Sequence, residues 1–391
     1  MADVPDTVVI VGGGLAGAKT AEALREQGYA GSVTLVGAED ELPYERPPLS
    51  KGYLLGKDEF EKAVVHPEKW YAEHDVDLRR GVRVTAIDRA AHEVELDDGT
   101  RLPYGALVLA TGSEPRTLAV PGAEPLSLRT HADSDRIKAT FGAGKRLAVV
   151  GGGWIGLEVA AAAREAGTDV TLVEAGEQPL LGVLGPEMGK VFADLHREHG
   201  VDLRLDSTDL TGLDADAVVV GIGVRPRTEL AEAAGLDVDN GVLVDASLHT
   251  SDPDIYAVGD IANHDHPVLG RIRVEHWATA LNQPAAAAAA ILGGYAPYER
   301  LPYFFSDQYD LGMEYVGHAT RDDTARVVTR GDVEKREFVA FWLDDQDRIL
   351  AAMNVNVWDV PDEVRPLIVN RTVVDVDKLA DPDIPLPDVG R

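Results

Sequence analysis

The strongest constraint on the fold is a glycine-rich turn that occurs twice, once near residue 12 and again near residue 151. In both places a short, unbroken apolar run leads into the pattern G-x-G-x-x-G, and a helical pattern follows. Such a run is typical of a buried parallel strand. The first glycine allows a tight turn, the second lets a phosphate approach the backbone, and the third lets helix and strand pack closely. Each copy therefore predicts a strand–turn–helix unit that binds a dinucleotide at the helix N-terminus.

The first copy has the chain context that makes this pattern specific. Its strand begins at Thr7, its helix is expected over 18–27, and a second strand over 32–36 is followed by an acidic residue, Glu39. An acid at this distance from the turn is suited to bind a ribose hydroxyl. The residues expected to hold this first nucleotide are Gly12, Gly14, Leu15, Ala16, Gly17 and Glu39.

The second copy predicts a helix that runs to about residue 166 and a strand over 169–173 that ends on Glu174. A carboxylate at this strand end accepts hydrogen bonds from a ribose 2′-hydroxyl and repels a 2′-phosphate. No Arg or Lys lies between Glu174 and Lys190 to receive such a phosphate. We therefore expect NADH to be preferred over NADPH. The residues expected to bind it are Gly151, Gly153, Trp154, Ile155, Gly156 and Glu174.

Two further segments indicate that the first nucleotide is FAD. The strand over 106–112, which ends on Ala110, Thr111 and Gly112, is the usual return of a flavoprotein's first segment. The run from Thr250 forms another strand that ends on Gly259 and Asp260. An Asp at that point can hydrogen-bond the flavin ribitol, while the helix expected to follow would direct its N-terminus at the cofactor.

Composition narrows the classes of function. The sequence has no cysteine, which excludes disulfides, Cys-ligated metal sites or iron–sulfur clusters, and a redox-active dithiol in these 391 residues. The net charge of −30 argues against nucleic acid or an anionic membrane as the main partner. No apolar run approaches the roughly 20 residues of a membrane helix, and the first residues lack the pattern of a signal peptide. We therefore expect a cytoplasmic protein.

The segment 44–51, Tyr-Glu-Arg-Pro-Pro-Leu-Ser-Lys, makes the match to a known family specific. With it, the chain resembles the FAD- and NADH-dependent reductases that serve oxygenases, the group that includes putidaredoxin reductase and biphenyl-dioxygenase ferredoxin reductase. The resemblance covers essentially the whole chain and includes the motifs at 151–158, 195–201 and 221–226. Its most distinctive motif is Phe305-Ser-Asp-Gln-Tyr309, because this segment lies outside the two nucleotide-binding patterns.

The resemblance implies roles for individual residues. Lys51 matches the family lysine beside the N5 and C4-carbonyl edge of the flavin. Glu158 matches the helix glutamate that pairs with this lysine near the nicotinamide, so these two are the candidate catalytic residues. Trp277 matches a residue packed at the pyrimidine side of the flavin. Other positions that the resemblance places at the cofactors are Arg46, Pro47, Val84, Arg129, Gly221, Ile222, Gly223, Glu275 and His276.

Three departures from the family pattern bear on these roles. Ala38 stands where the family often has the acid after the second strand, so either Glu39 takes over the ribose contact or that contact is weaker. The stretch between Val201 and Val218 is shorter than the antiparallel excursion of relatives. Phe305 stands where some relatives have a tryptophan proposed to lie on the electron path, which puts an aromatic relay in doubt.

We expect an α/β fold with two Rossmann-like dinucleotide-binding domains and a C-terminal α+β domain. The FAD-binding domain is expected at 1–113 and 240–297, with the NAD-binding domain, 114–239, inserted into it. The C-terminal domain, 298–391, should contain strands at 337–343 and 348–357 and a helix near 362–370. It is expected to cover the flavin and to form part of the acceptor or dimer surface of a monomer or homodimer.

Together, these features predict an NADH:ferredoxin oxidoreductase. In this reading FAD passes electrons from NADH to a small iron–sulfur ferredoxin that feeds a monooxygenase or dioxygenase, and the acceptor is implied by the resemblance alone. Two alternatives remain open. One is a cysteine-independent NADH oxidase, and the other is a redox sensor that resembles the apoptosis-inducing-factor flavoproteins.

Docking and metal binding complete the sequence-based expectations. Small ferredoxins are usually acidic, as is this chain, so docking requires a local basic patch, for which Arg46, Arg271 and Arg273 are the candidates. His264 and His266 resemble a metal-binding pair in a loop, but no third ligand is evident, so no metal site is expected. His196 and its neighbour His199 are expected on a polar helix face.

Overall fold

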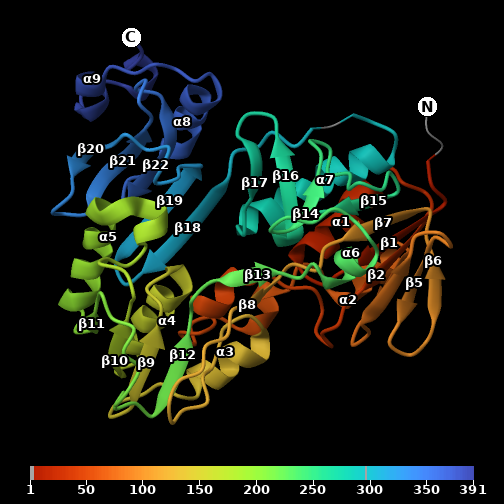
Figure 1. Ribbon diagram of the computed structural model, residues 1–391, viewed down its shortest axis with the longest axis horizontal. Helices are drawn as coiled ribbons and strands as arrows, with labels where there is room; N and C mark the ends of the chain where they lie inside the picture. Colours follow the sequence, from red (N-terminus) through yellow and green to blue (C-terminus); the bar gives the residue numbers. More distant parts are fainter. Residues whose placement is uncertain (1–3, 296) are drawn as a thin grey trace. The chain divides into compact units, whose positions relative to one another are not determined.

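The computed structural model describes residues 4–295 and 297–391 and consists of two compact units. Unit 1 contains residues 1–45, 60–114 and 224–300, and unit 2 contains residues 46–59, 115–223 and 301–391. The predicted fold class is confirmed, because there are two parallel sheets of the Rossmann-like type and an antiparallel C-terminal sheet (Figure 1). The division into three domains draws its boundaries differently from these units and stays a prediction.

Unit 1 is built on a five-stranded parallel sheet. Its strand order is β15 (Ile255–Ala257), β7 (Ala106–Leu109), β1 (Thr7–Val11), β2 (Ser32–Val36) and β3 (Val76–Arg79). Val8, Val9 and Ile10 are at most 2% exposed, and since successive side chains of a strand alternate, both faces of β1 are covered. Helices α1 (Leu15–Glu26) and α7 (Trp277–Ile291) pack against each other in this unit.

Two smaller sheets complete unit 1. One is the antiparallel meander of β4 (Val84–Asp88), β5 (Glu93–Leu96) and β6 (Arg101–Pro103), and the other joins β14 (Val242–Val244), β16 (Ala262–His266) and β17 (Gly270–Arg273). The remaining elements at or near this unit are α2 (Glu68–Glu73), α6 (Glu229–Ala233), β8 (Ser113–Pro115), β13 (Val224–Pro226), η2 (Phe60–Ala63) and η3 (Gly259–Ile261).

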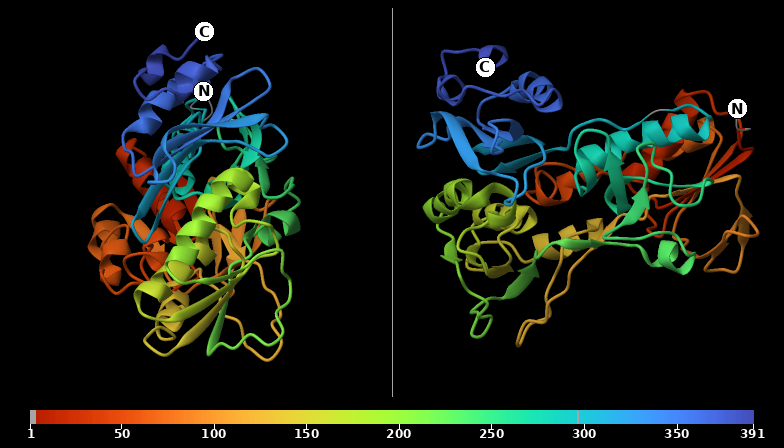
Figure 2. Two further views of the ribbon diagram at one scale, coloured as in Figure 1. Left: turned by 90° about the vertical axis from the view of Figure 1, so that its left-hand side faces the viewer. Right: turned by 45° about the horizontal axis from the view of Figure 1, so that its top comes forward.

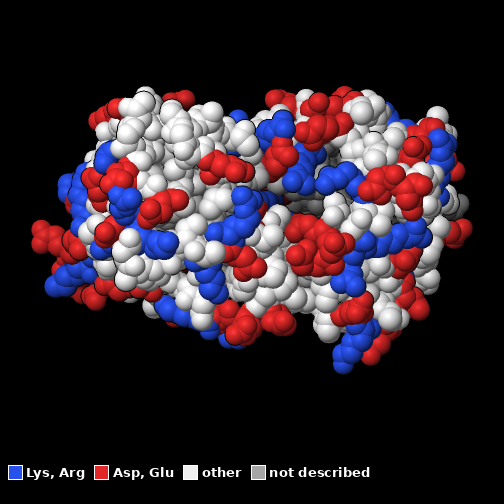
Figure 3. Space-filling view, turned by 90° about the horizontal axis from the view of Figure 1, so that it is seen from below, with Lys and Arg blue, Asp and Glu red and all other residues white. Residues whose placement is uncertain are grey.

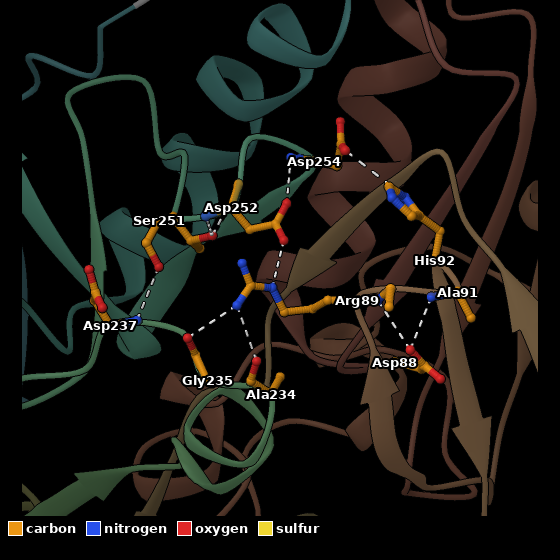
Figure 4. A network of polar contacts seen from close by, with 12 residues as sticks. Asp88, Arg89, Ala91, His92, Ala234, Gly235, Asp237, Ser251, Asp252 and Asp254 are labelled. Carbon is orange, nitrogen blue, oxygen red and sulfur yellow. Dashed lines mark hydrogen bonds and ion pairs between the residues drawn. The ribbon is translucent and has the colours of Figure 1, made fainter.

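Arg89, the residue directly after β4, ties the meander to a distant part of the same unit (Figure 4). Its guanidinium donates to a carboxylate oxygen of Asp252 at 2.6 Å and to the carbonyl oxygens of Ala234 and Gly235 at the end of α6. One arginine thereby satisfies two helix-end carbonyl groups and pairs with a charged turn residue, which fixes β4 against the segment that leads into β15.

The parallel sheet of unit 2 has four strands. Its order is β11 (Asp202–Arg204), β10 (Asp169–Val173), β9 (Arg146–Val150) and β12 (Ala217–Val220). The helices of this part are α3 (His131–Lys138), α4 (Trp154–Glu165) and α5 (Leu181–Glu198), and the short turn η1 (Pro47–Ser50) also belongs to unit 2. Helices α1 and α4 both begin directly at their glycine-rich turns, so α1 starts three residues earlier than its predicted first residue, 18.

The C-terminal sheet of unit 2 is antiparallel and has five strands. Its order is β18 (Tyr303–Gln308), β19 (Leu311–Gly317), β22 (Ile349–Val355), β21 (Glu337–Leu343) and β20 (Arg326–Asp332). Helix α8 (Val360–Val369) packs on β19 and β22, and α9 (Val376–Ala380) packs on β20, before the last turn η4 (Leu386–Asp388) (Figure 2). Phe304, Tyr315 and Trp342 of the sheet share one apolar core with residues of α4 and α5.

In residues 4–295 and 297–391, no helix combines the length and the apolar character that crossing a membrane requires.

Candidate functional site

The first glycine-rich turn joins β1 to α1 in unit 1. Gly12 has a φ of 126°, and a Cβ at this residue would lie 2.1 Å from the carbonyl oxygen of Ala110. A Cβ on Gly17 would lie 1.9 Å from the carbonyl oxygen of Gly12. Strand and helix approach each other so closely here that both positions require glycine.

Gly14 is in a different situation from its two neighbours in the motif. Leaving aside the adjacent residues, no atom of the described chain lies within 4 Å of a Cβ built on Gly14. Gly14 is the N-cap of α1 and supplies no side chain to the amide groups of Leu15, Ala16 and Gly17. Exposed amides and the positive end of the helix dipole form a site for an anion. The open space at Gly14 therefore fits the approach of a dinucleotide pyrophosphate to the backbone.

Two segments predicted at the first nucleotide lie beside this turn. The segment Ala110–Gly112 is in contact with it, because a Cβ on Gly12 would lie 3.0 Å from the backbone nitrogen of Thr111. Gly259 is also adjacent, because a Cβ built on it would lie 3.1 Å from the Cβ of Ala16. The chain thus gathers three separate segments around the start of α1.

The segment after Gly259 differs from the prediction. Asp260 lies in the single turn η3, and β16 follows at once, so the helix expected after Asp260 is absent. The pairing of β16 with β14 and β17 explains this outcome, because it draws the chain into a sheet. The amide of Gly259 donates to the side-chain oxygen of Gln283 on α7 at 2.8 Å. Gln283 was not predicted from the sequence.

The 44–51 motif begins in unit 1 and supplies partners to two predicted site residues. The hydroxyl of Tyr44 donates to Glu39 at 2.5 Å, and the indole nitrogen of Trp277 donates to Glu45 at 3.0 Å. Glu39 and Trp277 are therefore held by side chains, and Tyr44 and Glu45 were not singled out by the sequence. Val84 is a core residue with 5% of its surface exposed.

The second glycine-rich turn, in unit 2, repeats the geometry of the first. Gly151 has a φ of 105°, and its Cβ would lie 2.5 Å from the carbonyl oxygen of Gly221. A Cβ on Gly156 would lie 2.0 Å from the carbonyl oxygen of Gly151. Gly153, the N-cap of α4, is again open, with the carbonyl oxygen of Gly221 at 3.8 Å as its nearest described contact. The turn and the predicted segment Gly221–Gly223 thus lie together.

The apolar residues at this turn fall into two groups. The ring of Trp154 packs edge-on against Phe192 and Phe304, with centroids 5.4 and 5.0 Å away, so its side chain belongs to the core. Ile155 and Ile222 are 40% and 36% exposed. These two side chains are the more exposed ones at the turn, whereas Trp154 is half-buried.

Glu174 lies at the end of β10, as predicted, and its carboxylate is held by the backbone. One oxygen accepts the amide of Gly152 at 2.5 Å and the other accepts the amide of Gly176 at 2.7 Å. Each carboxylate oxygen has two lone pairs, so both retain capacity for a further donor. The structure therefore fixes a negative charge at the second glycine-rich turn.

Lys51 and Glu158, the candidate catalytic residues, form an ion pair in unit 2. The ammonium nitrogen of Lys51 lies 2.8 Å from a carboxylate oxygen of Glu158, and the two side chains are 16% and 4% exposed. The same oxygen accepts the hydroxyl of Ser306 at 2.7 Å, and the second oxygen accepts the hydroxyl of Ser50. The carboxylate of Glu158 thus has a counter-ion and two hydroxyl donors, which compensate for its burial.

Alternation along β18 explains how the C-terminal sheet reaches this pair. Phe304, Ser306 and Gln308 point to one side of the strand and are 9%, 1% and 1% exposed. Phe305 and Asp307 point to the other side. The ammonium group of Lys51 nevertheless lies 5.4 Å from the centroid of the Phe305 ring, which is within cation–π distance. Ser306 and Gln308 were part of a family motif but were not predicted as site residues.

Arg46 and Arg129 are brought together in unit 2. The guanidinium of Arg46, just before Pro47 and η1, donates to the carbonyl oxygen of Arg129. The amide of Arg129 donates to Asp133 at 3.2 Å, at the start of α3. The backbone at Arg129 is therefore fixed by both neighbours.

Of the arginines expected to form a basic patch, Arg273 is already paired, and the patch itself stays a prediction. Arg273 pairs with Glu275, next to His276, the N-cap of α7, and its side chain is only 8% exposed. Arg271 is exposed but donates to the carbonyl oxygen of Asn263 at 2.8 Å. The charge of Arg273 is therefore used within unit 1. On the face drawn in Figure 3, basic and acidic side chains are interspersed, and neither sign covers the surface.

The histidines also differ from expectation. His264 and His266 lie on strand β16, not in a loop, and each is 2% exposed. Among residues 4–295 and 297–391, no group of three or more potential metal ligands is present. His196, expected on a polar helix face, is fully buried.

Two family models match the chain. The pyridine nucleotide-disulphide oxidoreductase model matches residues 6–284, and the reductase C-terminal model matches residues 303–389. The ferredoxin–NAD(+) reductase component of the anthranilate 1,2-dioxygenase system of Burkholderia cepacia is 44% identical over 97% of this chain and 98% of its own length. Putidaredoxin reductase of Pseudomonas putida is 40% identical over 98% of this chain and 96% of its own length.

Solved structures agree with these sequence relations. The putidaredoxin reductase–putidaredoxin complex matches with a TM-score of 0.92 and 39% identity, covering 98% of both chains. The ferredoxin reductase of the CYP199A2 system from Rhodopseudomonas palustris matches with a TM-score of 0.93 and 35% identity, covering 99% of this chain and all of the other. This chain therefore belongs to the pyridine nucleotide-disulphide oxidoreductase family, in the branch of the ferredoxin–NAD(+) reductases.

Proposed function

We propose that this chain is an NADH:ferredoxin oxidoreductase that supplies electrons to an oxygenase system. One NADH reduces two molecules of oxidised ferredoxin by one electron each and leaves NAD⁺ and one proton. The observation that carries the proposal is the buried Lys51–Glu158 ion pair, in a chain that has two dinucleotide-binding turns and no cysteine. Without cysteine, electrons cannot pass to a dithiol of this chain.

FAD fits the first glycine-rich turn and the segments around it. The open space at Gly14 and the uncapped start of α1 suit its pyrophosphate. We assign Glu39 to its ribose and Asp260 to its ribitol. When bound, FAD accepts a hydride from NADH and gives up electrons singly, which is the chemistry that the cofactor contributes. The protein's part is to bind, to orient and to supply charge.

We assign Lys51 to the reacting edge of the flavin, where its ammonium group supplies positive charge. Positive charge at that edge favours the negative charge that develops there when a hydride arrives. A lysine side chain is flexible and costly to immobilise, so it needs a partner that fixes it. Glu158 is that partner, since its carboxylate is itself held by Ser50 and Ser306.

NADH is assigned to the second glycine-rich turn. Its pyrophosphate suits the open space at Gly153, and its adenosine ribose suits the carboxylate of Glu174, which two backbone amides fix in place. The same fixed negative charge opposes the 2′-phosphate of NADPH. NADH is therefore the preferred donor. We assign the protein to the cytoplasm, as a monomer or homodimer.

A comparison of acceptors tests the proposed function. Purified holoenzyme is given NADH, and the rate of NADH oxidation is measured with oxygen alone and with a panel of [2Fe–2S] ferredoxins. A ferredoxin-dependent acceleration of at least a hundredfold supports the reductase. Rapid oxygen consumption without any ferredoxin effect would replace it with an NADH oxidase. A long-lived reduced complex with NAD⁺ and little turnover would replace it with a redox sensor.

A further inference from the structure

Glu158 is the end of a buried chain of hydrogen bonds that extends well beyond Lys51. Its oxygen accepts the hydroxyl of Ser306 at 2.7 Å, and the oxygen of Ser306 lies 3.1 Å from the side-chain nitrogen of Gln308. The side-chain oxygen of Gln308 lies 2.9 Å from Nε2 of His196. All of these residues belong to unit 2, and they come from α4, β18 and α5.

The side chains that form this series of hydrogen bonds are shielded from water. Ser306, Gln308 and His196 are at most 1% exposed, and Glu158 is 4% exposed. Polar groups at such positions are costly unless each is hydrogen-bonded. The hydrogen bonds between these four side chains meet that requirement.

Elementary donor and acceptor counting fixes the direction of every bond. An ionised Glu158 can only accept, so the single hydroxyl proton of Ser306 points to it. Ser306 must then accept from the amide group of Gln308, whose carbonyl oxygen is left facing His196. His196 must therefore carry a proton on Nε2, and in the neutral ring its Nδ1 is then an acceptor. The hydroxyl of Tyr309 lies 3.4 Å from that Nδ1.

The burial of His196 agrees with this assignment. Desolvation, the largest influence, lowers its pKa to about 4, against the bond with Gln308, which raises the pKa. The histidine is therefore neutral at ordinary pH, and a neutral ring with its proton on Nε2 fits the direction of the bonds. His196 also meets its charged or ionisable neighbours His199 and Tyr309, which stack on each other at 3.7 Å.

We propose that Ser306, Gln308 and His196 are positioning residues that hold Glu158 ionised and oriented toward Lys51. Every proton in the array points toward the carboxylate: those of His196, Gln308, Ser306, Ser50 and Lys51. Each donor stabilises the charged form, and a chain of aligned donors polarises its members in the same sense. The proposal rests on the proposed function, because it concerns the ion pair that serves hydride transfer.

A protonated Glu158 would break this order. It would donate one proton, so at least one hydroxyl donor would lose its acceptor, and Lys51 would lose its counter-ion. Asp307 on β18 is a further ionisable group whose charge interacts with the pair. Its pKa is raised, first by partial desolvation and then by the charge of Glu158, while Lys51 acts in the opposite direction. The array therefore makes the rate of hydride transfer depend on the ionisation of Glu158.

The first test reads the direction of the bonds without using activity. Holoenzyme with ¹⁵N-labelled histidine is studied by NMR between pH 5 and 8, and the His196→Gln variant identifies the His196 signals among those of the 11 histidines. The proposal requires a neutral His196 with its proton on Nε2 throughout. A neutral ring with its proton on Nδ1 would reverse the direction of the bonds, and a charged ring at pH 6 would contradict the neutral state. Either result would overturn the proposal.

The second test reads the consequence for Glu158. The bleaching of the flavin at saturating NADH is followed without oxygen by stopped flow between pH 5 and 9, per mole of bound flavin. Ser306→Ala should move the acid limb of the rate upward by about one pH unit, and so slow bleaching about tenfold on that limb, because one charge-assisted bond is lost. Ser306→Thr, which keeps the hydroxyl, should restore the wild-type limb.

Two further variants distinguish positioning from a general loss of stability. Thr168→Val removes another buried hydroxyl of unit 2, which accepts the amide of Gly142 at 2.8 Å at the far end of α4, and it should keep the wild-type profile. Gln308→Met should shift the limb in the wild type but have no added effect in the Ser306→Ala background, because Gln308 acts through Ser306.

The outcomes separate this proposal from the function on which it rests. If wild-type flavin is not bleached by NADH, the proposed function fails, and the NMR result still decides the direction of the array. If the wild type is bleached, superimposable acid limbs in the wild type, Ser306→Ala and Gln308→Met overturn the proposal alone. Full additivity of Gln308→Met and Ser306→Ala would overturn it as well.

Discussion

Lys51 is carried by the segment 46–59, which leaves unit 1 and joins the core of unit 2 through Leu54. The proposed role of its ammonium group predicts that Lys51→Met slows the reduction of the flavin by NADH well over tenfold, since the charge at the reacting edge is lost. Lys57→Met is the matched control, because Lys57 lies on the same segment and pairs with Glu165 at the surface. Stopped-flow bleaching measures both, and an unchanged rate in Lys51→Met would rule out the assignment.

Glu174 sets the expected preference between the two nicotinamide nucleotides. Glu174→Ala should lower the ratio of kcat/KM for NADH to that for NADPH by at least about tenfold, because it removes an acceptor for the 2′-hydroxyl and the repulsion of a 2′-phosphate. Glu177→Ala, an exposed acid in the same loop, is the control and should keep the ratio. A wild-type ratio in Glu174→Ala would place the discrimination elsewhere.

His196 makes the stability of the fold depend on pH. Its pKa is lowered by burial to about 4, so between pH 6.5 and 4 the unfolded chain binds a proton that the folded chain does not. Its contribution to stability is therefore complete above pH 6.5 and falls as the pH drops toward 4, by up to about 3 kcal/mol.

Thermal unfolding tests this dependence on pH. His196→Gln should show a smaller decrease of Tm between pH 6.5 and 4 than the wild type, although its Tm at neutral pH is lower. His92→Gln, at an exposed position, should keep the wild-type decrease. Equal decreases in the wild type and in His196→Gln would contradict a neutral, buried His196.

The burial of His196 also shows where reasoning from a single segment fails. Its helix sequence, Leu195-His-Arg-Glu-His-Gly-Val201, has the polar pattern of an exposed face. Its partner in the interior is Gln308, which is also buried and lies 112 residues away in the sequence. The contact of Ser306 with Glu158 is likewise a tertiary contact. Local patterns therefore could not assign a role to Ser306 or to Gln308. Lys51 and Glu158 were predicted because the family resemblance carries that long-range information.

At the level of elements, different glycines of one glycine-rich turn are needed for ligand binding and for folding. Gly14→Ala adds a Cβ where the described chain leaves open space, so the protein should fold but hold FAD weakly. Gly17→Ala places a Cβ 1.9 Å from a backbone oxygen of Gly12, so it should fail to fold. The measurements are flavin content and circular dichroism of the purified variants. Full flavin occupancy in Gly14→Ala would contradict the binding of the pyrophosphate at this turn.

Elements that depend on local sequence were predicted accurately, and elements that depend on tertiary pairing were not. The strands over 32–36, 169–173 and 337–343 have the predicted bounds, because each is a short apolar run with clear turn residues around it. The helix expected after Asp260 is replaced by one turn, because sheet pairing of β16, which local sequence does not reveal, competes with it. The start of α1 moves to Leu15, since a glycine N-cap gives a weak boundary signal.

At the level of the whole molecule, charge is the main constraint on partner binding. The net charge of −30 disfavours long-range attraction to an acidic ferredoxin, and Arg273 is already paired inside unit 1. Recognition then depends on short-range complementarity, so the rate of ferredoxin reduction should change little with salt between 50 and 300 mM, in contrast to a strongly complementary pair. A steep fall with salt would reveal a basic docking surface.

The central claim is that electrons leave NADH as a pair and reach ferredoxin singly. It is tested most directly by titrating the holoenzyme and an excess of oxidised [2Fe–2S] ferredoxin with NADH in the absence of oxygen, while the absorbance of the iron–sulfur centre is recorded. We expect two ferredoxins to be reduced for each NADH consumed, with catalytic amounts of the protein. Consumption of NADH that stops after one equivalent per flavin, with the ferredoxin still oxidised, would contradict it.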